Sequence, residues 1–159
     1  MLFRCSIFIT KKDYNVFMKK IITTLALLTI YNTTIAQDNT RELVKLPPMM
    51  QNHMMANMRD HLAAINEIQL YLADEKMDEA AQVAENRLGM SSMDSHKAKH
   101  MSQFMPKEMA AIGTSMHRAA SRFALKAEEG DLLPAYKALA QVTSACVACH
   151  SKYKIANIK

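Results

Sequence analysis

Glycine, proline and cysteine are scarce in this chain of 159 residues, which contains three Gly, four Pro and three Cys. Few Gly and Pro leave few places for the tight turns that join the strands of a sheet. In addition, no segment alternates apolar and polar residues as a half-buried strand does. The sequence therefore predicts helices and nothing else.

Several signatures of enzymes and of nucleic-acid-binding proteins are also missing. The chain shows no paired carboxylates, no nucleophile beside a base and no glycine-rich phosphate loop. Its basic residues do not gather into the patch or stripe that nucleic acid binding requires. We therefore expect neither an enzyme nor a nucleic-acid partner.

A single long apolar run lies near the N-terminus. Residues 21–30 are apolar, two lysines precede them and small residues follow. This order is typical of a cleavable signal peptide, with Met18 as the better start and cleavage before Gln37. The run is too short to span a bilayer core of about 30 Å, so no stable membrane anchor is expected. We predict export to the periplasm, removal of residues 1–36 and one domain over residues 37–159.

Removal of residues 1–36 changes the charge and the cysteine content. It takes away Cys5, five of the 20 Lys and Arg and one of the 15 Asp and Glu, so the formal net charge falls from +5 to +1. Only Cys146 and Cys149 remain, and no second cysteine pair is present to complete a structural zinc site. A thioredoxin-like redox pair is also disfavoured, because no βαβ pattern surrounds the two cysteines.

Apolar residues of the mature sequence recur at steps of three and four, the spacing of amphipathic helices. The predicted helices run from Pro48 to about Ala73, from about Asp78 to Leu88, from Pro106 to Gly130 and from Asp131 to about Tyr153. A disordered lead over residues 37–46 and an irregular connection over residues 90–105 complete the chain. The inward stripe of the last helix is expected to comprise Leu132, Tyr136, Leu139, Val142, Cys146, His150 and Tyr153. Four such helices predict an all-α, antiparallel up-down-up-down four-helix bundle with a cofactor between facing helices.

The motif C-x-x-C-H stands near the C-terminus, at Cys146-Val147-Ala148-Cys149-His150. Two thiols at this spacing can add to the two vinyl groups of one porphyrin from a single short helical segment. The histidine that follows can then bind the iron as its proximal ligand. The motif therefore predicts one haem c, attached through Cys146 and Cys149 on the C-terminal helix, with His150 on the iron.

A haem motif at the end of a helical chain resembles the class II c-type cytochromes, that is, the cytochrome c-prime family and its low-spin, methionine-ligated relatives. The similarity covers about residues 43–154. It includes Tyr153-Lys154 after the haem motif and the Asp78-Glu79-Ala80-Ala81-Gln82 start of the second helix. The resemblance implies a periplasmic haem-binding four-helix bundle, often a homodimer packed through its first two helices. It also implies single-electron transfer between redox partner proteins.

The resemblance further implies that the residue facing the iron opposite His150 comes from the first helix. Counting along the chain as the family does places Met58 there, with Met54 and His61 one turn to either side. A methionine ligand would suit electron transfer. An iron left open would instead bind NO or CO, which makes a gas sensor or scavenger the first alternative. Because Met is also common core filler, Met58, Met54, His61 and an open iron all remain candidates.

A second alternative is a Met- and His-rich metal-binding protein. His96 and His100 are spaced i, i+4 in the segment of residues 90–105. Met93, Met101 and Met105 are near them in sequence, and His53, Met54 and Met55 in the first predicted helix add further possible ligands. Imidazoles and thioethers suit copper or another soft metal. No cysteine or carboxylate completes a recognisable ligand pattern, so this segment could equally pack over the edge of the haem.

Overall fold

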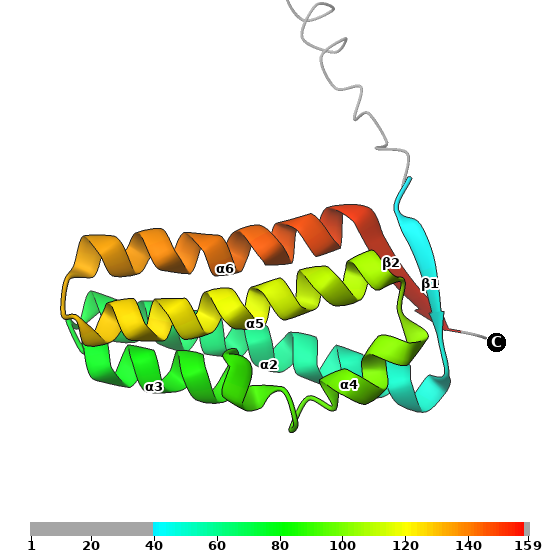
Figure 1. Cartoon of the computed structure of the whole chain (residues 1–159), viewed down its shortest axis with the longest axis horizontal. Coiled ribbons are helices and arrows are strands. Elements are labelled where there is room, and N and C mark those ends of the chain that lie inside the picture. Colours follow the sequence, from blue (N-terminus) through cyan, green and yellow to red (C-terminus); the bar gives the residue numbers. More distant parts are fainter. Residues whose placement is uncertain (1–39, 158–159) are drawn as a thin grey trace, which may run out of the picture. The chain divides into compact units, whose positions relative to one another are not determined.

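The computed structural model of the chain describes residues 40–157, so the predicted signal peptide and its cleavage site lie outside the described residues. The described part is mostly helical, as predicted (Figure 1). Its elements in chain order are β1 (Glu42–Leu46), α2 (Pro48–Ala73), α3 (Met77–Arg87), the 3₁₀ turn η1 (Met90–Ser92), α4 (Ala98–Met101), the 3₁₀ turn η2 (Ser102–Phe104), α5 (Lys107–Glu128), α6 (Leu132–Lys152) and β2 (Tyr153–Asn157).

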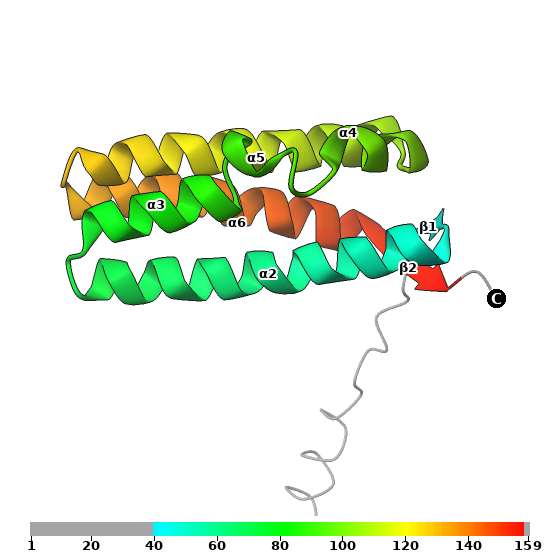
Figure 2. The same ribbon diagram turned by 90° about the horizontal axis from the view of Figure 1, so that it is seen from below.

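The helices α2, α3, α5 and α6 lie side by side and share a core. Helices α2 and α5 run in one direction, and α3 and α6 in the other (Figures 1 and 2). Helix α2 packs on α3, α3 on α5 and α5 on α6. The largest fully buried side chains of this core are Ile68, Leu72, Leu88, Phe123 and Val142. Helices α2 and α6, by contrast, are not among the closely packed pairs of this domain.

Proline and glycine mark the helix ends where the sequence predicts them. Pro47 and Pro106 precede the first residues of α2 and α5, where a missing N–H costs no helical hydrogen bond. Gly130 follows α5 with φ of +78°, a left-handed conformation that side chains disfavour. Gly89, after α3, has an ordinary φ, but a Cβ there would lie 2.8 Å from Cα of Glu85. Gly89 is therefore needed because the backbone at this position passes very close to the backbone of Glu85.

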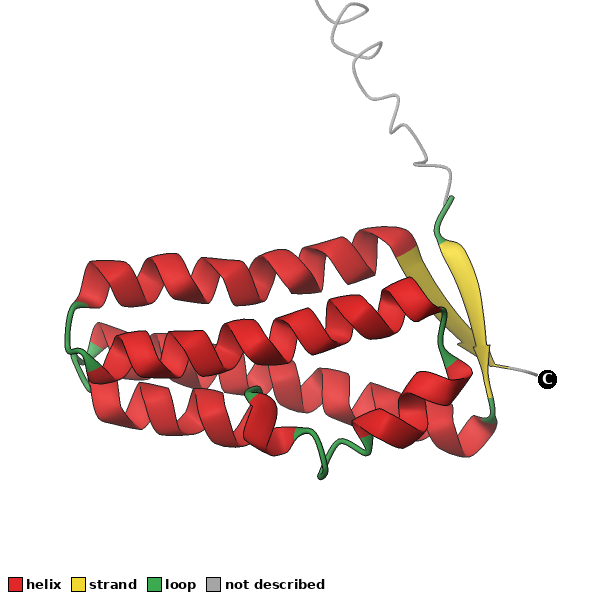
Figure 3. Ribbon diagram, in the orientation of Figure 1, coloured by secondary structure: helices red, strands yellow, loops and turns green. Residues whose placement is uncertain are grey.

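A small parallel sheet joins the two ends of the domain and corrects the prediction of helices alone (Figure 3). The predicted disordered lead over residues 37–46 is wrong for its last five residues, which form β1. Glu42 pairs with Tyr153 and Leu46 with Asn157. The strand forms because its apolar residues Val44 and Leu46 share one face and are buried with Met50, Met109 and Tyr153. Two alternating positions are too short a pattern to stand out in the sequence.

The buried face of α6 also differs from the predicted stripe. Leu132 and Tyr136 are exposed, and the buried residues are Ala135, Leu139 and Val142. Leu139, Val142 and Tyr153 of the predicted stripe are buried as expected, so the prediction is wrong at the start of the helix, where Ala135 is buried in place of Leu132 and Tyr136. Among residues 40–157, α6 is the helix long and apolar enough to cross a membrane by length and composition.

Candidate functional site

The C-x-x-C-H motif occupies the end of α6 and faces a cavity of about 440 Å³. The wall formed by α6 includes Cys146, Cys149 and His150, and the wall formed by α2 comprises Met58, His61, Leu62 and Ile65. The cavity lies where α2 and α6 are not closely packed, between the first and last long helices of the domain. The three motif residues that the sequence singles out are therefore brought to one site.

The two cysteines lie one turn apart and contact different parts of the core. Cys146 packs against the cluster around Phe123, and Cys149 against the smaller cluster that contains Met109 and Tyr153. Both are free thiols, and the Cys146 S–H donates to the carbonyl oxygen of Val142 at 3.4 Å. Burial raises the pKa of both thiols. This is the opposite of the lowered pKa that activates a redox C-x-x-C pair.

The end of α6 is held in place by the residues that follow His150. His150 itself is exposed, contrary to the predicted inward stripe, although it lines the cavity. Two residues later, the Lys152 ammonium donates to the Glu108 carboxylate of α5 at 2.5 Å. The next residue, Tyr153, is buried and starts β2. Helix α5 and strand β1 thus fix the backbone that carries the motif.

The opposite wall separates the three candidates for a distal ligand. Met58 and His61 line the cavity that contains His150, whereas Met54 lines only a neighbouring cavity of about 240 Å³. All three side chains are half-buried, and the fully buried part of α2 on this stripe begins at Ala64. The structure therefore brings Met58 and His61, but not Met54, to the cavity that His150 lines.

His61 carries a buried nitrogen without a hydrogen-bond partner among the described residues, its Nε2. Burial, followed by the nearby His96 and His117, lowers the pKa of His61 from 6.5 to about 4. The imidazole is therefore neutral at pH 7. A buried polar atom left unpaired costs about 1–3 kcal/mol, so this position is hard to explain by packing alone.

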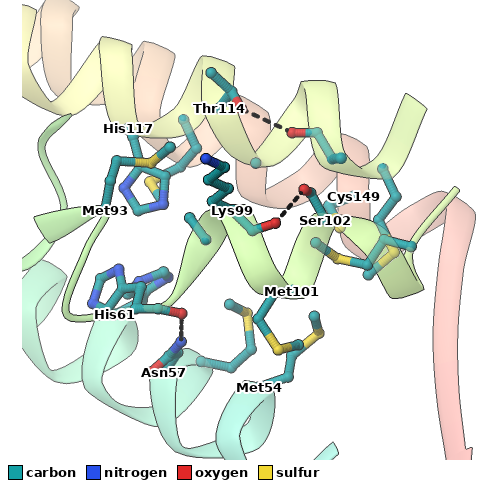
Figure 4. Close-up of a pocket in the computed structure, with 18 residues that line it drawn as sticks. Met54, Asn57, His61, Met93, Lys99, Met101, Ser102, Thr114, His117 and Cys149 are labelled. Atoms are coloured by element: carbon teal, nitrogen blue, oxygen red, sulfur yellow. Dashed lines mark hydrogen bonds between the residues drawn. The ribbon is translucent and has the colours of Figure 1, made fainter. Parts of the chain in front are cut away.

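Three histidines from separate segments meet in the wall of the 240 Å³ cavity. Figure 4 labels two of them, His61 and His117. The ring centroids of His61 and His96 are 4.8 Å apart, those of His96 and His117 are 5.4 Å apart, and those of His61 and His117 are 5.9 Å apart. We call His61, His96 and His117 the histidine cluster. His100, the predicted i, i+4 partner of His96, is exposed and instead stacks edge-on against Phe104.

His117 is the member of the histidine cluster that the sequence analysis missed. It belongs to a stripe of α5 at helical spacing whose other members are Gly113, Ala120, Ala124 and Ala127. Ala120, Ala124 and Ala127 are buried. A polar residue on such a buried stripe is the signal that could have identified it. The sequence analysis instead chose the adjacent stripe, one position away, because it carries the larger apolar residues Met116 and Phe123.

Hydrogen bonds hold the rings of the histidine cluster in position. Nδ1–H of His117 donates to the carbonyl oxygen of Leu88 at 2.7 Å, which leaves a lone pair on Nε2. The Nδ1 atoms of His96 and His117 each lie 3.4 Å from Oγ of Ser92. On the other side, Nε2–H of His53 donates to the carbonyl oxygen of His96 at 2.9 Å. The loop after α3 is thereby fixed against both α2 and α5.

Methionines dominate the remaining wall of the 240 Å³ cavity. They are Met54, Met58, Met93, Met101, Met105, Met109 and Met116. Among the described residues, no Asp or Glu lines this cavity. Asp60, the residue before His61, is bonded to the Arg87 guanidinium, and this bond lowers the pKa of Asp60. Counting only His, Cys, Asp and Glu of the described residues, no group of three has its donor atoms arranged for a metal ion.

The chain matches none of the protein-family models, curated proteins or solved structures with which it was compared. What the larger cavity can hold is therefore judged from its walls. Gly113, in the middle of α5, lines both cavities, and a Cβ there would meet nothing within 4 Å. A glycine inside a helix costs about 0.5–1 kcal/mol relative to alanine, so the open space beside it is retained at a cost. Two thiols, an imidazole, an orphaned nitrogen and this open space fit a covalently bound haem.

Proposed function

We propose that this chain is an exported c-type cytochrome that passes single electrons between redox partner proteins in the periplasm. In this proposal the packed helices are a four-helix bundle, and one haem c occupies the cavity between α2 and α6. The observation that carries it is that Cys146, Cys149 and His150 line one wall of an apolar cavity whose other wall offers a sulfur or nitrogen ligand.

Each residue of the site has a distinct role in the proposal. The Cys146 and Cys149 thiols would hold the haem as thioethers, and His150 would be the proximal ligand. When bound, the haem supplies a reversible one-electron change at its iron. The apolar side chains of Ile65 and Val142 would keep water from the inner part of the cavity.

The position of the motif supports a carrier that exchanges electrons with other proteins. Val147, which stands between the two cysteines, is 66% exposed, and His150 is exposed as well. The attachment side of the cavity is therefore close to the protein surface. A partner could approach this end of α6 without any opening of the helices.

We propose Met58 as the sixth ligand. His61 lies on the same wall, but its ring packs against His96 and His117, which belong to the other cavity. The Met58 side chain has no ring and takes no part in these histidine contacts. A thioether in this position favours ferrous iron relative to a second nitrogen ligand and suits an electron carrier.

The proposal is tested by producing the chain together with a haem-maturation system. The purified protein should begin at Gln37, keep its haem through acid-acetone extraction and show one added haem mass under denaturing conditions. Cys146→Ser with Cys149→Ser should abolish the attachment, while Cys5→Ser, which lies ahead of the mature sequence, should change nothing. Haem that washes out, or a mature chain with two free thiols, would contradict the proposal.

A gas-binding haem protein is the second candidate. The 240 Å³ cavity adjoins Met58 and His61, and it would give NO or CO room on the distal side. A visible spectrum separates the two functions, because a six-coordinate low-spin ferrous haem has a sharp α band and a five-coordinate one a broad band. Rapid binding of CO by the unmodified protein would favour the gas-binding function.

A further inference from the structure

Within residues 40–157, Lys99 is the only Lys, Arg, Asp or Glu in the walls of the two cavities. It lines the 240 Å³ cavity, where the other side chains are apolar, hydroxyl, amide, imidazole or thiol groups. Lys99 also takes no part in the ion pairs of the described residues, which instead involve Lys76, Arg87, Lys126 and Lys152. Its ammonium is therefore available to an anionic group that enters the cavity.

The segment that carries Lys99 is fixed against the core. Met101 of α4 is buried in the cluster that contains Met109 and Tyr153. Oγ–H of Ser102 donates to the carbonyl oxygen of Lys99 at 2.8 Å. Figure 4 shows the Lys99 side chain extending from α4 toward α5, with Cys149 well separated from it. Because Lys99 is exposed overall, its ammonium stands at the mouth of the cavity.

The 240 Å³ cavity adjoins the cavity proposed for the haem. The residues that line both are Met58, His61, Gly113, Met116 and Cys149. A haem carries its two vinyl groups on one side of the porphyrin and its two propionates on the other. If Cys146 and Cys149 hold the vinyl side at α6, the propionate side is directed away from the motif. An ionised carboxylate that leaves water needs a cation or hydrogen-bond donors, and Lys99 is the cation that these walls offer.

We propose that the ammonium of Lys99 pairs with a haem propionate. This inference rests on the proposed function, because it assigns the one charge of that same site. In the pair an N–H of Lys99 donates to the carboxylate, which is a charge-assisted hydrogen bond. Ferric haem carries one more positive charge than ferrous haem, so a nearby ammonium disfavours the ferric state. Lys99 therefore acts as a positioning residue that also raises the reduction potential.

The proposal is tested by redox titration of the protein with covalently attached haem. Lys99→Met should lower the reduction potential, so that the equilibrium with a redox mediator shifts several-fold toward the ferric form. Lys99→Arg keeps the charge and the N–H donors, and it should keep the potential close to that of the unmodified protein. Lys97→Met is the matched control, because it removes the same charge from the same segment at a position that lines neither cavity. No shift in Lys99→Met, or equal shifts in Lys97→Met and Lys99→Met, would overturn the pair.

A second measurement does not depend on these variants. An amine-reactive acylating reagent should modify Lys99 more slowly, relative to Lys97, in the haem-bearing protein than in the chain with Cys146→Ser and Cys149→Ser. Mass mapping of peptides gives this ratio, and an equal ratio in the two proteins would contradict the pair. The two proposals fail in different ways. An unmodified chain that takes up no haem would end both, whereas attached haem with an unchanged potential in Lys99→Met would end only the pairing.

Discussion

His61 combines three properties that rarely occur together at one residue. It is half-buried, it lines both cavities, and its Nε2 has no hydrogen-bond partner among residues 40–157. Its neutral state is favoured because the surroundings exclude water and because His96 and His117 are close. Folding therefore opposes protonation of this imidazole, and stability must depend on pH.

The first prediction concerns the chain that carries Cys146→Ser and Cys149→Ser, freed of metal. Between pH 6.5 and about 4, the unfolded chain binds a proton at His61 that the folded chain does not. Stability should therefore fall as the pH is lowered through this range, by at most about 3 kcal/mol from this residue, and the loss should level off below the range. Urea unfolding at a series of pH values measures it.

The lowered pKa of His96, caused first by its burial, acts in the same direction. His61→Gln should flatten the pH dependence, and His100→Gln should preserve it because His100 is exposed. A pH profile that is identical in the unmodified chain and in His61→Gln would show that His61 is freely protonated in the folded state.

A second prediction at a single residue concerns Met58. If its thioether is the sixth ligand, ferric protein should show a weak far-red sulfur-to-iron charge-transfer band. Met58→Ala should remove this band, lower the reduction potential and open the iron to CO, because the ligand that favours ferrous iron is lost. Visible spectra and a redox titration measure these changes.

Met54→Ala is the matched control for Met58→Ala, since Met54 lines only the neighbouring cavity. It should leave the far-red band in place. If His61→Ala changes the spin state and Met58→Ala does not, the sixth ligand is His61, and the register of α2 against the haem is shifted by one turn.

Among the elements, α5 places its two glycines in opposite situations. Gly113 lies inside the helix beside open space, and Gly130 follows the helix with φ of +78°. Without haem, Gly113→Ala should stabilise the chain by about 0.5–1 kcal/mol through better helix propensity. Gly130→Ala should destabilise it by about 1 kcal/mol, because alanine is strained in the left-handed conformation. Urea unfolding compares the two variants.

The haem-bound protein provides the control for the glycine pair. In that state the Cβ of Gly113→Ala would compete for space with the haem, so the stabilisation should disappear or reverse. Gly130, whose added Cβ meets nothing within 4 Å, should show the same loss in both states. An equal gain from Gly113→Ala with and without haem would place the haem elsewhere.

The elements that could be predicted from the sequence are those with local signals. Periodicity located α2, α3, α5 and α6, and Pro106 and Gly130 marked both ends of α5 to within two residues. The strand β1 could not be predicted, because its stability comes from pairing with residues at the other end of the domain. The start of α6 was misjudged because Ala135 is buried there in place of Leu132 and Tyr136, which the size and hydropathy of an alanine do not reveal.

At the scale of the whole molecule, the two parts of the site differed in how far they could be predicted. Cys146, Cys149 and His150 lie within five consecutive positions, so the sequence alone predicts that they share one site. The histidine cluster draws on α2, the loop before α4 and α5, and its members are separated by more than 20 positions. Sequence proximity favoured His100 as the partner of His96, whereas the fold supplies His61 and His117.

A prediction at this scale concerns the sheet that joins the ends of the domain. Leu46 is fully buried, so Leu46→Ala should lower the free energy of unfolding by about 2–5 kcal/mol through lost burial and the remaining cavity. Leu43 in the same strand is 43% exposed, and Leu43→Ala should change the free energy of unfolding by less than about 0.5 kcal/mol. Thermal and urea unfolding compare the two variants. If Leu46→Ala and Leu43→Ala had equal effects on stability, β1 would not pack as described.

The cavity proposed for the haem leads to a further expectation for the domain as a whole. A group that binds only the folded chain stabilises it, and covalent attachment makes this gain permanent. Protein with haem should therefore melt at a higher temperature and more cooperatively than chain with Cys146→Ser and Cys149→Ser. Calorimetry of the two proteins checks this, and identical melting curves would show that the helices do not depend on the haem.

The pairing of β1 with β2 also sets an order of events in the making of the protein. Strand β1 is the first described element and can pair only when β2, the last described element, has been delivered. If the chain is exported as proposed, a segment that emerges early must wait until export is complete, and closing so long a loop is slow. Cys146 and Cys149 lie in the last turns of α6, before β2, and in this proposal they would be reached before the strands pair. We expect haem attachment before the strands pair, so that the sheet closes over a finished site.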